Sequence, residues 1–324
     1  MTTSVDADRS DFNVSDLFDV GADILWRDHA GDNVLWLMNN NTPSVVAPLA
    51  AVPPDWHLKA AAEFDSGNGN ADILWQNDNG GLALWQMNGT TVTAINPLPN
   101  PGPTWHVVGD NNFDTVGTGG GDDILFQNDN GAVVLWTGIS AATGTVSNIF
   151  ASTLNPGPDW RVVGTGDTTG DGKAGILWQN DNGALVMWED SRITMNLRMA
   201  FDTVAALPTV DPSWHVKGMA DFSGDGRSDI VFQHDSGAVA VWEMSGTTIS
   251  ATNLVNLNPG PAWHIVGMRD MDGDGNPDIL FQNDSGAAAV WEGYAELGGG
   301  SATFHTVLAI NPNPNPNGHV WDLL

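Results

Sequence analysis

One short phrase, Asp-Ile-Leu followed by Trp or Phe, recurs with small changes along the whole chain. Its isoleucine stands at positions 24, 73, 124, 176, 230 and 279, so successive copies lie 49 to 54 residues apart. A second Trp follows every copy, and a third Trp opens a short apolar run in each unit. Self-similarity with a period of this length is typical of repeat architectures such as propellers and solenoids.

Each unit contains four short segments with the composition of β-strands. Examples are Trp105–Gly109, Asp123–Gln127 and Ala132–Trp136, with the Thr-rich segment Thr90–Ile95 as a fourth-strand example from the unit before. An Asp-Asn-Gly turn joins the second and third segments, and this is a hairpin signal because Asn and Gly accept positive φ. No segment has a convincing helical period, although Ile193–Val204 is irregular. Four strands in about 50 residues, repeated around a ring, predict an all-β, six-bladed β-propeller.

The ends of the repeat favour a closed ring over an open β-solenoid. The first unit begins at its second strand, Asp23–Trp26, and the chain ends with a lone Trp-opened strand, Trp321–Leu324. Polar capping repeats, which an open array needs, are missing at both ends. We therefore expect one propeller domain over residues 1–324, with residues 1–14 as a poorly ordered tail. Its first blade would be shared between the N-terminal part and residues 318–324, which removes the sheet edges.

The sharpest chemical signal lies between the first and second strands of the last two units. Residues 270–278 read DMDGDGNPD and residues 221–229 read DFSGDGRSD. Oxygen-bearing side chains stand at loop positions 1, 3, 5 and 9, and a Gly turn wraps alternate side chains around one point, as Ca²⁺ requires. Position 7 needs to offer only its carbonyl. The predicted ligands are Asp221, Ser223, Asp225, Arg227 and Asp229 in one loop, and Asp270, Asp272, Asp274, Asn276 and Asp278 in the other.

The fourth unit keeps only part of this pattern. Asp167, Thr169 and Asp171 stand at positions 1, 3 and 5 and are candidate ligands, but Gly175 stands at position 9. Calcium binding therefore stays open for this loop. For every loop the alternative is an Asp/Gly-rich surface turn without an ion.

The first three units depart further from the pattern. The second loop, Glu63–Asp72, is one residue longer and has Asn68 where an Asp would help. The third loop, Asp114–Asp123, is rich in Gly and poor in ligands, and the first, around Asp19 and Asp23, is too short. We expect calcium as the cofactor of the fifth and sixth loops and no ion in the first and third.

The segment Phe-Ser-Gly-Asp-Gly-x-x-Asp-Ile at residues 222–230, with its following Gly-containing hairpin, resembles the FG-GAP/VCBS repeat. That repeat builds the propellers of integrin α-subunits and of many bacterial surface and secreted proteins. The Trp-Gln-Asn-Asp-Asn-Gly form at residues 75–80 is similar to the bacterial branch, and the resemblance extends over residues 15–324. It implies a propeller with calcium in the first-to-second-strand loops and a role in adhesion or ligand binding, including sugars bound between blades.

Charge and composition narrow the partners. The chain has 39 acidic and 10 basic residues and a net charge of −29, which argues against nucleic acid and anionic membranes. No apolar run approaches the roughly 20 residues of a membrane span, so we expect no membrane insertion. The chain has no Cys, which excludes thiol catalysis and disulfides. We expect a bacterial secreted or cell-surface protein, exported without a cleavable N-terminal signal peptide because Met1–Ser10 is polar.

Repeated amides are the candidate ligand-binding residues. They directly precede the hairpin turn of four units, at Gln76 and Asn77, Gln127 and Asn128, Gln179 and Asn180, and Gln282 and Asn283. Amides beside an aromatic edge suit sugar hydroxyls, and several copies would give multivalency. The alternative is that these residues build the turn.

Three functions are therefore compared. The first is a carbohydrate-binding or adhesive propeller whose partner is a glycan. The second is a protein-binding or structural module of a larger surface assembly, whose partner is a surface protein. The third is a polysaccharide-active enzyme, but no catalytic motif is visible, and nothing breaks the repeat as an added catalytic loop would. An irregular Gly-rich insertion, Leu297–Ser301, stands next to the only tyrosine, Tyr294. The periodic histidines are expected to be structural, and we expect no enzyme; they are His57, His106, His215 and His264.

Overall fold

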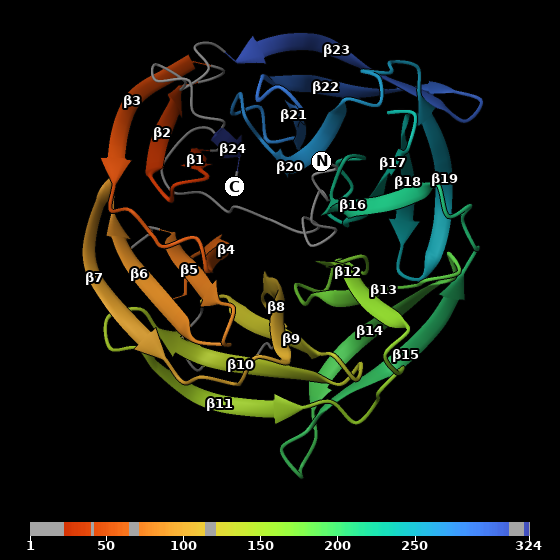
Figure 1. Cartoon of the computed structure of the whole chain (residues 1–324). Helices are drawn as coiled ribbons and strands as arrows, with labels where there is room; N and C mark the ends of the chain where they lie inside the picture. Colours follow the sequence, from red (N-terminus) through yellow and green to blue (C-terminus); the bar gives the residue numbers. More distant parts are fainter. Residues whose placement is uncertain (1–22, 40–41, 65–70, 114–120, 311–320, 324) are drawn as a thin grey trace, which may run out of the picture.

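The chain forms an all-β ring of sheets (Figure 1). The computed structural model describes residues 23–39, 42–64, 71–113, 121–310 and 321–323. This part of the chain contains twenty-four strands and no helix, so the all-β prediction is confirmed. The expected tail at residues 1–14, the predicted segment 318–320, the first loop around Asp19 and the centres of the second and third loops lie outside the described residues.

Three sheets consist of four sequential strands, and in Figure 1 the first strand of each lies nearest the middle of the ring. The first of these sheets contains β4 (Trp56–Ala62), β5 (Asp72–Asn77), β6 (Leu82–Asn88) and β7 (Thr91–Leu98). The second contains β8 (Trp105–Asn111), β9 (Asp123–Asn128), β10 (Val133–Ser140) and β11 (Thr145–Ala151). The third contains β12 (Trp160–Gly166), β13 (Gly175–Asn180), β14 (Leu185–Ile193) and β15 (Met199–Leu207).

The other strands form one larger sheet and one sheet built from both ends of the chain. The eight-stranded sheet joins two sequential runs, because β19 runs parallel to β23 at Leu254 and Val255. Its first run is β16 (Trp214–Ala220), β17 (Asp229–His234), β18 (Val239–Ser245) and β19 (Thr248–Val255). Its second run is β20 (Trp263–Arg269), β21 (Asp278–Asn283), β22 (Ala288–Gly298) and β23 (Ser301–Ile310).

The remaining sheet has the order β24–β1–β2–β3. Its strands are β1 (Ile24–Asp28), β2 (Asn33–Asn39), β3 (Thr42–Leu49) and the C-terminal β24 (Trp321–Leu323). β24 pairs antiparallel with β1, and Leu323 lies opposite Trp26. The Trp-opened strand of this sheet therefore comes from the C-terminal end, whereas in every other four-strand run it comes from the residues just before.

Glycine turns bring neighbouring connections into close contact. Gly80 has φ of +85°, and a Cβ placed there would lie 2.8 Å from the backbone nitrogen of Pro103. Only glycine meets both conditions, because a side chain would strain the backbone and collide with the next loop. The hairpin turn between β5 and β6 therefore packs directly against the Pro/Gly turn that leads into β8.

The core lies between neighbouring sheets. Trp26, Trp36, Trp75 and Trp178 are each no more than 2% exposed. One apolar cluster combines Leu25 of β1 with residues of β4, β5 and β6, and the other clusters likewise join adjacent sheets. These tryptophans fill space between sheets and present no open face for a ligand.

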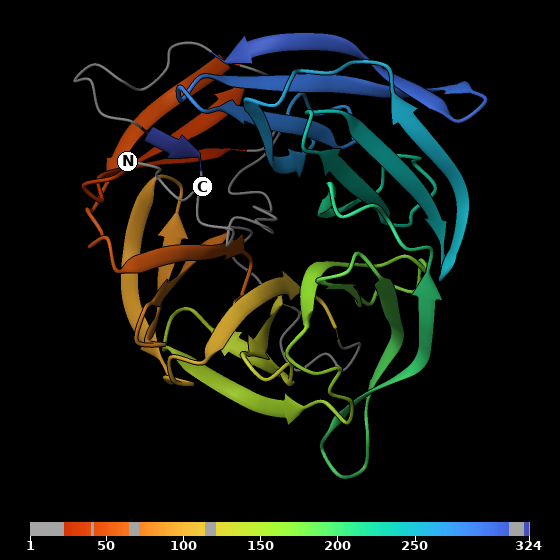
Figure 2. The same cartoon turned by 45° about the vertical axis from the view of Figure 1, so that its right-hand side comes forward.

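The irregular segment Ile193–Val204 forms a hairpin between β14 and β15 that projects beyond the ring (Figure 2). Met195 at its tip is fully exposed, and Leu197 has a φ of +55°. In the described part of the chain, no helix long and apolar enough to cross a membrane is found.

Candidate metal centre

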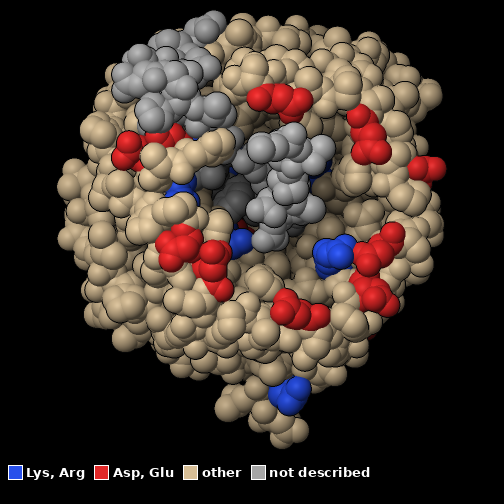
Figure 3. Space-filling view, in the orientation of Figure 1, with Lys and Arg blue, Asp and Glu red and all other residues tan. Residues whose placement is uncertain are grey.

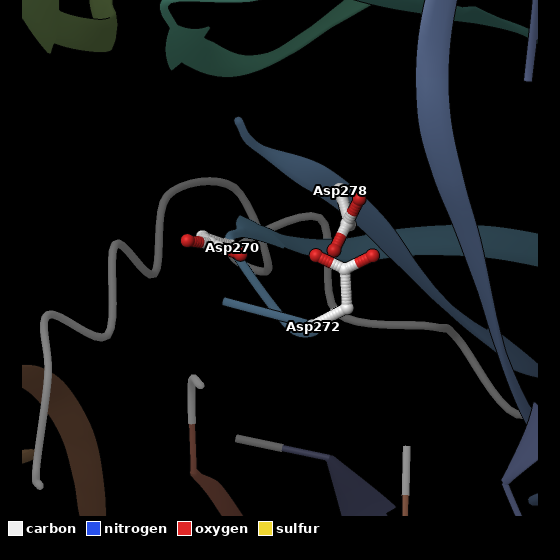
Figure 4. Close-up of side chains that lie close together, drawn as sticks. All are labelled: Asp270, Asp272 and Asp278. Carbon is white, nitrogen blue, oxygen red and sulfur yellow. The ribbon is translucent and has the colours of Figure 1, made fainter. Parts of the chain in front are cut away.

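The sixth loop, Asp270–Asp278, gathers three carboxylates between β20 and β21 (Figure 4). Asp270, Asp272 and Asp278 each offer an oxygen, and these atoms all lie within 4.8 Å of one another. Among the described residues, this is the one group of three or more potential ligands found at such distances. Three carboxylates at this spacing repel one another unless a cation or protons lie between them.

The backbone of the sixth loop wraps around Asp270. Its carboxylate accepts hydrogen bonds from the amides of Gly273 at 2.7 Å, Asp274 at 3.1 Å and Gly275 at 2.7 Å. Gly273 and Gly275 both have positive φ, which glycine adopts without strain. The alternation of Asp and Gly therefore produces a tight turn with Asp270 at its centre.

One buried oxygen in this loop has no hydrogen-bond partner. Asp278 is 1% exposed, and its Oδ2 accepts the amide of Met271 at 2.8 Å, but its Oδ1 accepts no hydrogen bond. In three other repeats the corresponding Oδ1 accepts a backbone amide two residues after the third-strand Trp. These pairs are Asp23 with Met38 at 2.8 Å, Asp72 with Met87 at 3.0 Å and Asp229 with Met244 at 2.9 Å.

The sixth repeat has Gly293, with a φ of +67°, where those repeats have methionine. A buried, unpartnered carboxylate oxygen costs free energy unless something charged binds it. The donor set of the sixth loop therefore fits a hard cation such as Ca²⁺.

The raised pKa values of two sixth-loop carboxylates show that their negative charges are not compensated by neighbouring residues. Burial raises the pKa of Asp278 to about 7, and the charges of Asp272 and Glu292 act in the same direction. Burial also raises the pKa of Asp272. A bound divalent cation would reverse this effect, because it favours the ionised carboxylates that ligate it.

The fifth loop, Asp221–Asp229, has the same backbone arrangement with fewer converging charges. Asp221 accepts the amides of Gly224 and Gly226, both at 2.8 Å, and Asp229 accepts the amide of Ser223 at 2.9 Å. Arg227 at position 7 forms an ion pair with Asp225 at 3.2 Å. The loop thus has the same turn around its first Asp, but Asp221, Asp225 and Asp229 do not converge as the three sixth-loop carboxylates do, and Asp225 is paired with the guanidinium of Arg227.

The fourth loop, Asp167–Gly175, also has an internal cation. Asp167 accepts the amides of Gly170 and Gly172, both at 2.7 Å. The ammonium of Lys173 lies 3.0 Å from Asp171 and 3.3 Å from the carbonyl of Ser191. Positions 1 and 5 are therefore arranged as in the other two loops, and Thr169 at position 3 donates to Asp167 at 3.1 Å.

The side chains at position 7 turn back onto position 5. Asn276 donates to Asp274 at 3.1 Å, as Arg227 and Lys173 do to their own position-5 carboxylates. Their carbonyls as metal ligands remain a prediction.

The predicted sugar-binding amides have another role. The Nε2 of Gln76 donates to the carbonyl of Trp105 at 2.7 Å, and its Oε1 accepts the amide of Val107 at 3.0 Å. Gln127 binds Trp160 and Val162 of the next sheet in the same way, at 2.6 and 3.0 Å. These side chains are buried and use both amide atoms as clamps between sheets. Both amide atoms of Gln76 and Gln127 are thus engaged within the fold, and sugar binding by these two residues stays a prediction that their contacts do not support.

The remaining amides of that prediction are placed as follows. Gln282 is 5% exposed, so its amide is not available to a sugar, and Gln179 is half-buried. The Asn side chains build the adjoining turns, with Asn77 bound to Asp55 at 2.8 Å, Asn128 to Thr104 at 2.9 Å and Asn180 to the carbonyl of Asp159 at 3.0 Å. Asn283 accepts the amide of Ser285 at 2.9 Å, within its own turn.

The sequence analysis did not identify the role of Arg27 or the partners of the four periodic histidines. Arg27 stands where the other repeats have the clamp Gln, and it donates to the carbonyls of Trp56, Val52 and Pro53. Four exposed His–Asp pairs connect the first strand to the hairpin turn at 2.7 to 2.8 Å, each between a Trp-His step and the Asp of the turn. The histidine of the Trp-His step and the Asp of the hairpin turn recur at regular spacing, and this regularity could have suggested that they pair.

Acidic side chains gather at intervals around the face of the ring seen in Figure 3, and basic side chains are few. This distribution agrees with the excess of acidic residues in the sequence. A cation approaching this face meets a favourable potential.

Residues 221–281 match the FG-GAP-like repeat family. The matched segment begins at the first residue of the fifth loop and ends in β21, so it contains both loops with the full ligand pattern. The chain thus carries an FG-GAP-like repeat, as the resemblance in its sequence indicates.

Three solved structures are similar to this chain. The Nidogen/Laminin complex is 9% identical, covers 83% of this chain and 89% of that chain, and has a TM-score of 0.48. BBS1N in complex with ARL6DN is 12% identical, with coverages of 84% and 76% and a TM-score of 0.41. The C-terminal WD40 domain of Sif2 is 14% identical, with coverages of 86% and 79% and a TM-score of 0.42. Comparison with curated proteins gave no match.

Proposed function

We propose that this protein is a six-bladed β-propeller stabilised by calcium in its fifth and sixth loops. The observation that carries the proposal is the buried Oδ1 of Asp278, which accepts no hydrogen bond and lies beside Asp270 and Asp272. Six blades follow if each of the six sequence repeats, rather than each hydrogen-bonded sheet, is counted as one blade. The parallel pairing of β19 with β23 then joins two blades at their outer strands.

In the sixth loop, calcium would be held by Asp270, Asp272, Asp274 and Asp278 and by the carbonyl of Asn276. The fifth loop offers the equivalent positions, with Ser223 at position 3. The ion would neutralise the crowded carboxylates and tie the end of the first strand to the start of the second. Extracellular calcium modules bind at about 10⁻⁴ to 10⁻³ M, so such sites fill outside cells and stay nearly empty in the cytosol. We therefore place the protein outside the cell or on its surface.

The propeller itself would serve as a protein-binding or structural module of a larger surface assembly. The carbohydrate alternative rested on the repeated Gln-Asn pairs, and the clamp role of Gln76 and Gln127 removes much of that support. The enzyme alternative has no motif to favour it. A glycan array tests the carbohydrate alternative directly, and saturable binding of a defined sugar would put it back in first place.

The calcium proposal is tested by thermal melting in EDTA and in about 2 mM calcium, a concentration near that of extracellular fluids. A site whose dissociation constant lies tenfold below the free calcium concentration stabilises the fold by roughly 1.4 kcal/mol, so two sites contribute about 3 kcal/mol. The matched variant is Asp225→Ala combined with Asp274→Ala, and magnesium serves as an ion control because it prefers smaller, octahedral sites. If chelation lowers the wild-type melting temperature no more than that of the variant, calcium does not stabilise this propeller.

A further inference from the structure

The outer strands, meaning the fourth strand of each repeat, carry almost no charge, although the chain has a net charge of −29. No Asp, Glu, Lys or Arg occurs in five of them, β3, β7, β11, β19 and β23. The one charged residue of β15, Asp202, is paired with Arg192 at 2.7 Å. Two copies that approach with the acidic faces of Figure 3 together would repel each other, whereas copies that meet at the rim bring uncharged strands together.

The rim also exposes apolar side chains at a repeated position. In five repeats the residue directly opposite the third-strand Trp is a branched apolar residue that is more than half exposed. These residues are Val46 at 58%, Ile95 at 54%, Ile149 at 55%, Val204 at 53% and Val307 at 55%. The rim thus offers apolar contacts without charge to another protein surface.

Most outer strands have a feature that prevents a further strand from pairing with them. Pro43 and Pro48 interrupt β3, and Pro97 interrupts β7. β19 and β23 pair with each other, and the end of β11 is covered by the fourth repeat, where Thr153 donates to the carbonyl of Met199 at 2.8 Å. Prolines and covering contacts are the usual protection of a sheet edge.

β15 lacks such protection over most of its length. It is nine residues long, contains no Pro or Lys, and is the last strand of its sheet. The carbonyl of Met199 accepts an amide from the neighbouring repeat and so points away from β14. Backbone groups alternate in direction along a strand, so those of Phe201, Thr203 and Ala205 face the same outer edge. Among the described residues no strand pairs with these groups, and β15 is therefore open to a further strand.

The hairpin between β14 and β15 extends this open edge beyond the ring (Figure 2). Met195 at its tip is fully exposed, and Leu197 is 69% exposed. Arg198 donates to the carbonyl of Ser152 at 2.8 Å and so ties the hairpin to the third repeat. A neighbouring molecule at this part of the rim would therefore meet two large apolar side chains on an anchored hairpin.

We propose that two copies of this chain associate rim to rim, with the outer edges of their β15 strands paired antiparallel about a two-fold axis. A pairing centred on Thr203 brings Asp202 of one copy opposite Val204 of the other, so the two carboxylates do not face each other. The hairpin of each copy would then lie beside the end of β15 in the other, which covers Met195 and Leu197. This inference goes beyond the proposed function, because it concerns the rim and does not depend on the calcium loops.

Sedimentation velocity over a range of protein concentrations, at constant calcium, tests the association. We expect the wild type to pass from monomer to dimer as concentration rises. Val204→Lys places a charge on the open edge, and Ala205→Pro removes an outward N–H without removing a hydrogen bond to β14. Each should raise the dimer dissociation constant about tenfold or more, because a two-fold interface loses every contact twice.

Two other lysine substitutions are matched controls. Ile149→Lys on β11 and Val307→Lys on β23 change residues of the same register position and nearly the same exposure, and both should leave the dissociation constant unchanged. High salt should not weaken the dimer, because it screens the repulsion between two acidic chains and the proposed interface contains no ion pair between copies. If Ala205→Pro fails to fold, Val204→Lys decides, since it changes only an exposed side chain.

The opposite results would overturn the inference. A wild type that stays monomeric at every concentration does so, and it leaves the calcium proposal intact because melting in EDTA tests that separately. A dimer that persists in Val204→Lys, that is lost in either control variant, or that high salt dissociates would show that β15 is not the contact.

Discussion

Replacing Gln76 by Ala removes an amide that ties two neighbouring sheets together. Gln76 is 4% exposed, and its two hydrogen bonds reach the backbone of Trp105 and Val107 in the next sheet. The variant leaves a buried carbonyl and a buried N–H without partners, each of which costs about 1–3 kcal/mol. We expect a destabilisation of about 3 kcal/mol, a large share of the roughly 5–15 kcal/mol that holds a typical domain folded.

A second substitution at the same position separates hydrogen bonding from loss of volume. Gln76→Glu keeps the shape but places a carboxylate oxygen against the carbonyl of Trp105. When protonated, this group can donate again, so its pKa in the folded state is raised above its unfolded value of about 4.3. The stability that the protonated form provides is complete below that value and is lost as pH rises through the folded pKa. The deficit of Gln76→Glu should therefore shrink in acid, whereas that of Gln76→Ala should not.

Urea denaturation followed by tryptophan fluorescence measures both effects. The control is Gln86→Ala on β6, because Gln86 lies outside the clamp positions, and we expect a change of about 0.5 kcal/mol or less there. A Gln76→Ala variant as stable as the control would refute the clamp as a stabilising connection between these sheets. A variant that loses sugar binding at unchanged stability would instead restore the carbohydrate prediction.

Two further predictions concern the loops and the ring. Burial raises the pKa of Asp278 to about 7 and that of Asp229 to about 6, so in EDTA the stability from their protonated forms is present in acid and lost as pH rises through these values. The stabilisation by calcium is measured as the difference between melts in calcium and in EDTA. It should grow from about pH 5 to about pH 8, roughly one unit either side of these pKa values, and a larger effect at pH 5 would contradict the assignment. Deleting residues 318–324 removes β24, which pairs with Trp26, Arg27 and Asp28 of β1. We expect a lower and broader melting transition in calorimetry, and an unchanged transition would show that this pairing does not hold the ring closed.

The positions of the strands could be predicted from the sequence because turn residues such as Gly, Asn and Pro, which favour particular φ values, stand between the strands. The predicted segments Trp105–Gly109 and Asp123–Gln127 correspond to β8 and β9, which extend them by only one or two residues. The Gly-rich insertion Leu297–Ser301 gave no such guidance. It forms the turn between the long strands β22 and β23, and its end pairs in parallel with β19. That pairing depends on how two repeats meet in space, which local sequence does not specify.

The candidate site was predictable only in its local part. The spacing of Asp270, Asp272 and Asp278 within one turn indicates convergence, and the structure brings these three together. The partner of Gln76 lies 29 residues away and is a backbone carbonyl, which has no sequence signature. Glu189 approaches the fourth loop from another strand, so its place beside Gly175 emerges only once the sheet is formed.

The sixth loop also connects calcium binding to the junction between the last repeat and the first. Met271, at position 2 of this loop, is 1% exposed and packs in one apolar cluster with Ile24, Trp26 and Trp36 of the first repeat. The amide of Met271 is held by Asp278, the same carboxylate whose other oxygen lacks a partner. An ion bound to Asp278 would therefore fix the backbone that places Met271 between the two repeats. The two ends of the chain meet at this junction, where β24 pairs with β1. The sixth loop, which has the most converging carboxylates, therefore lies next to the part of the ring that noncovalent contacts close.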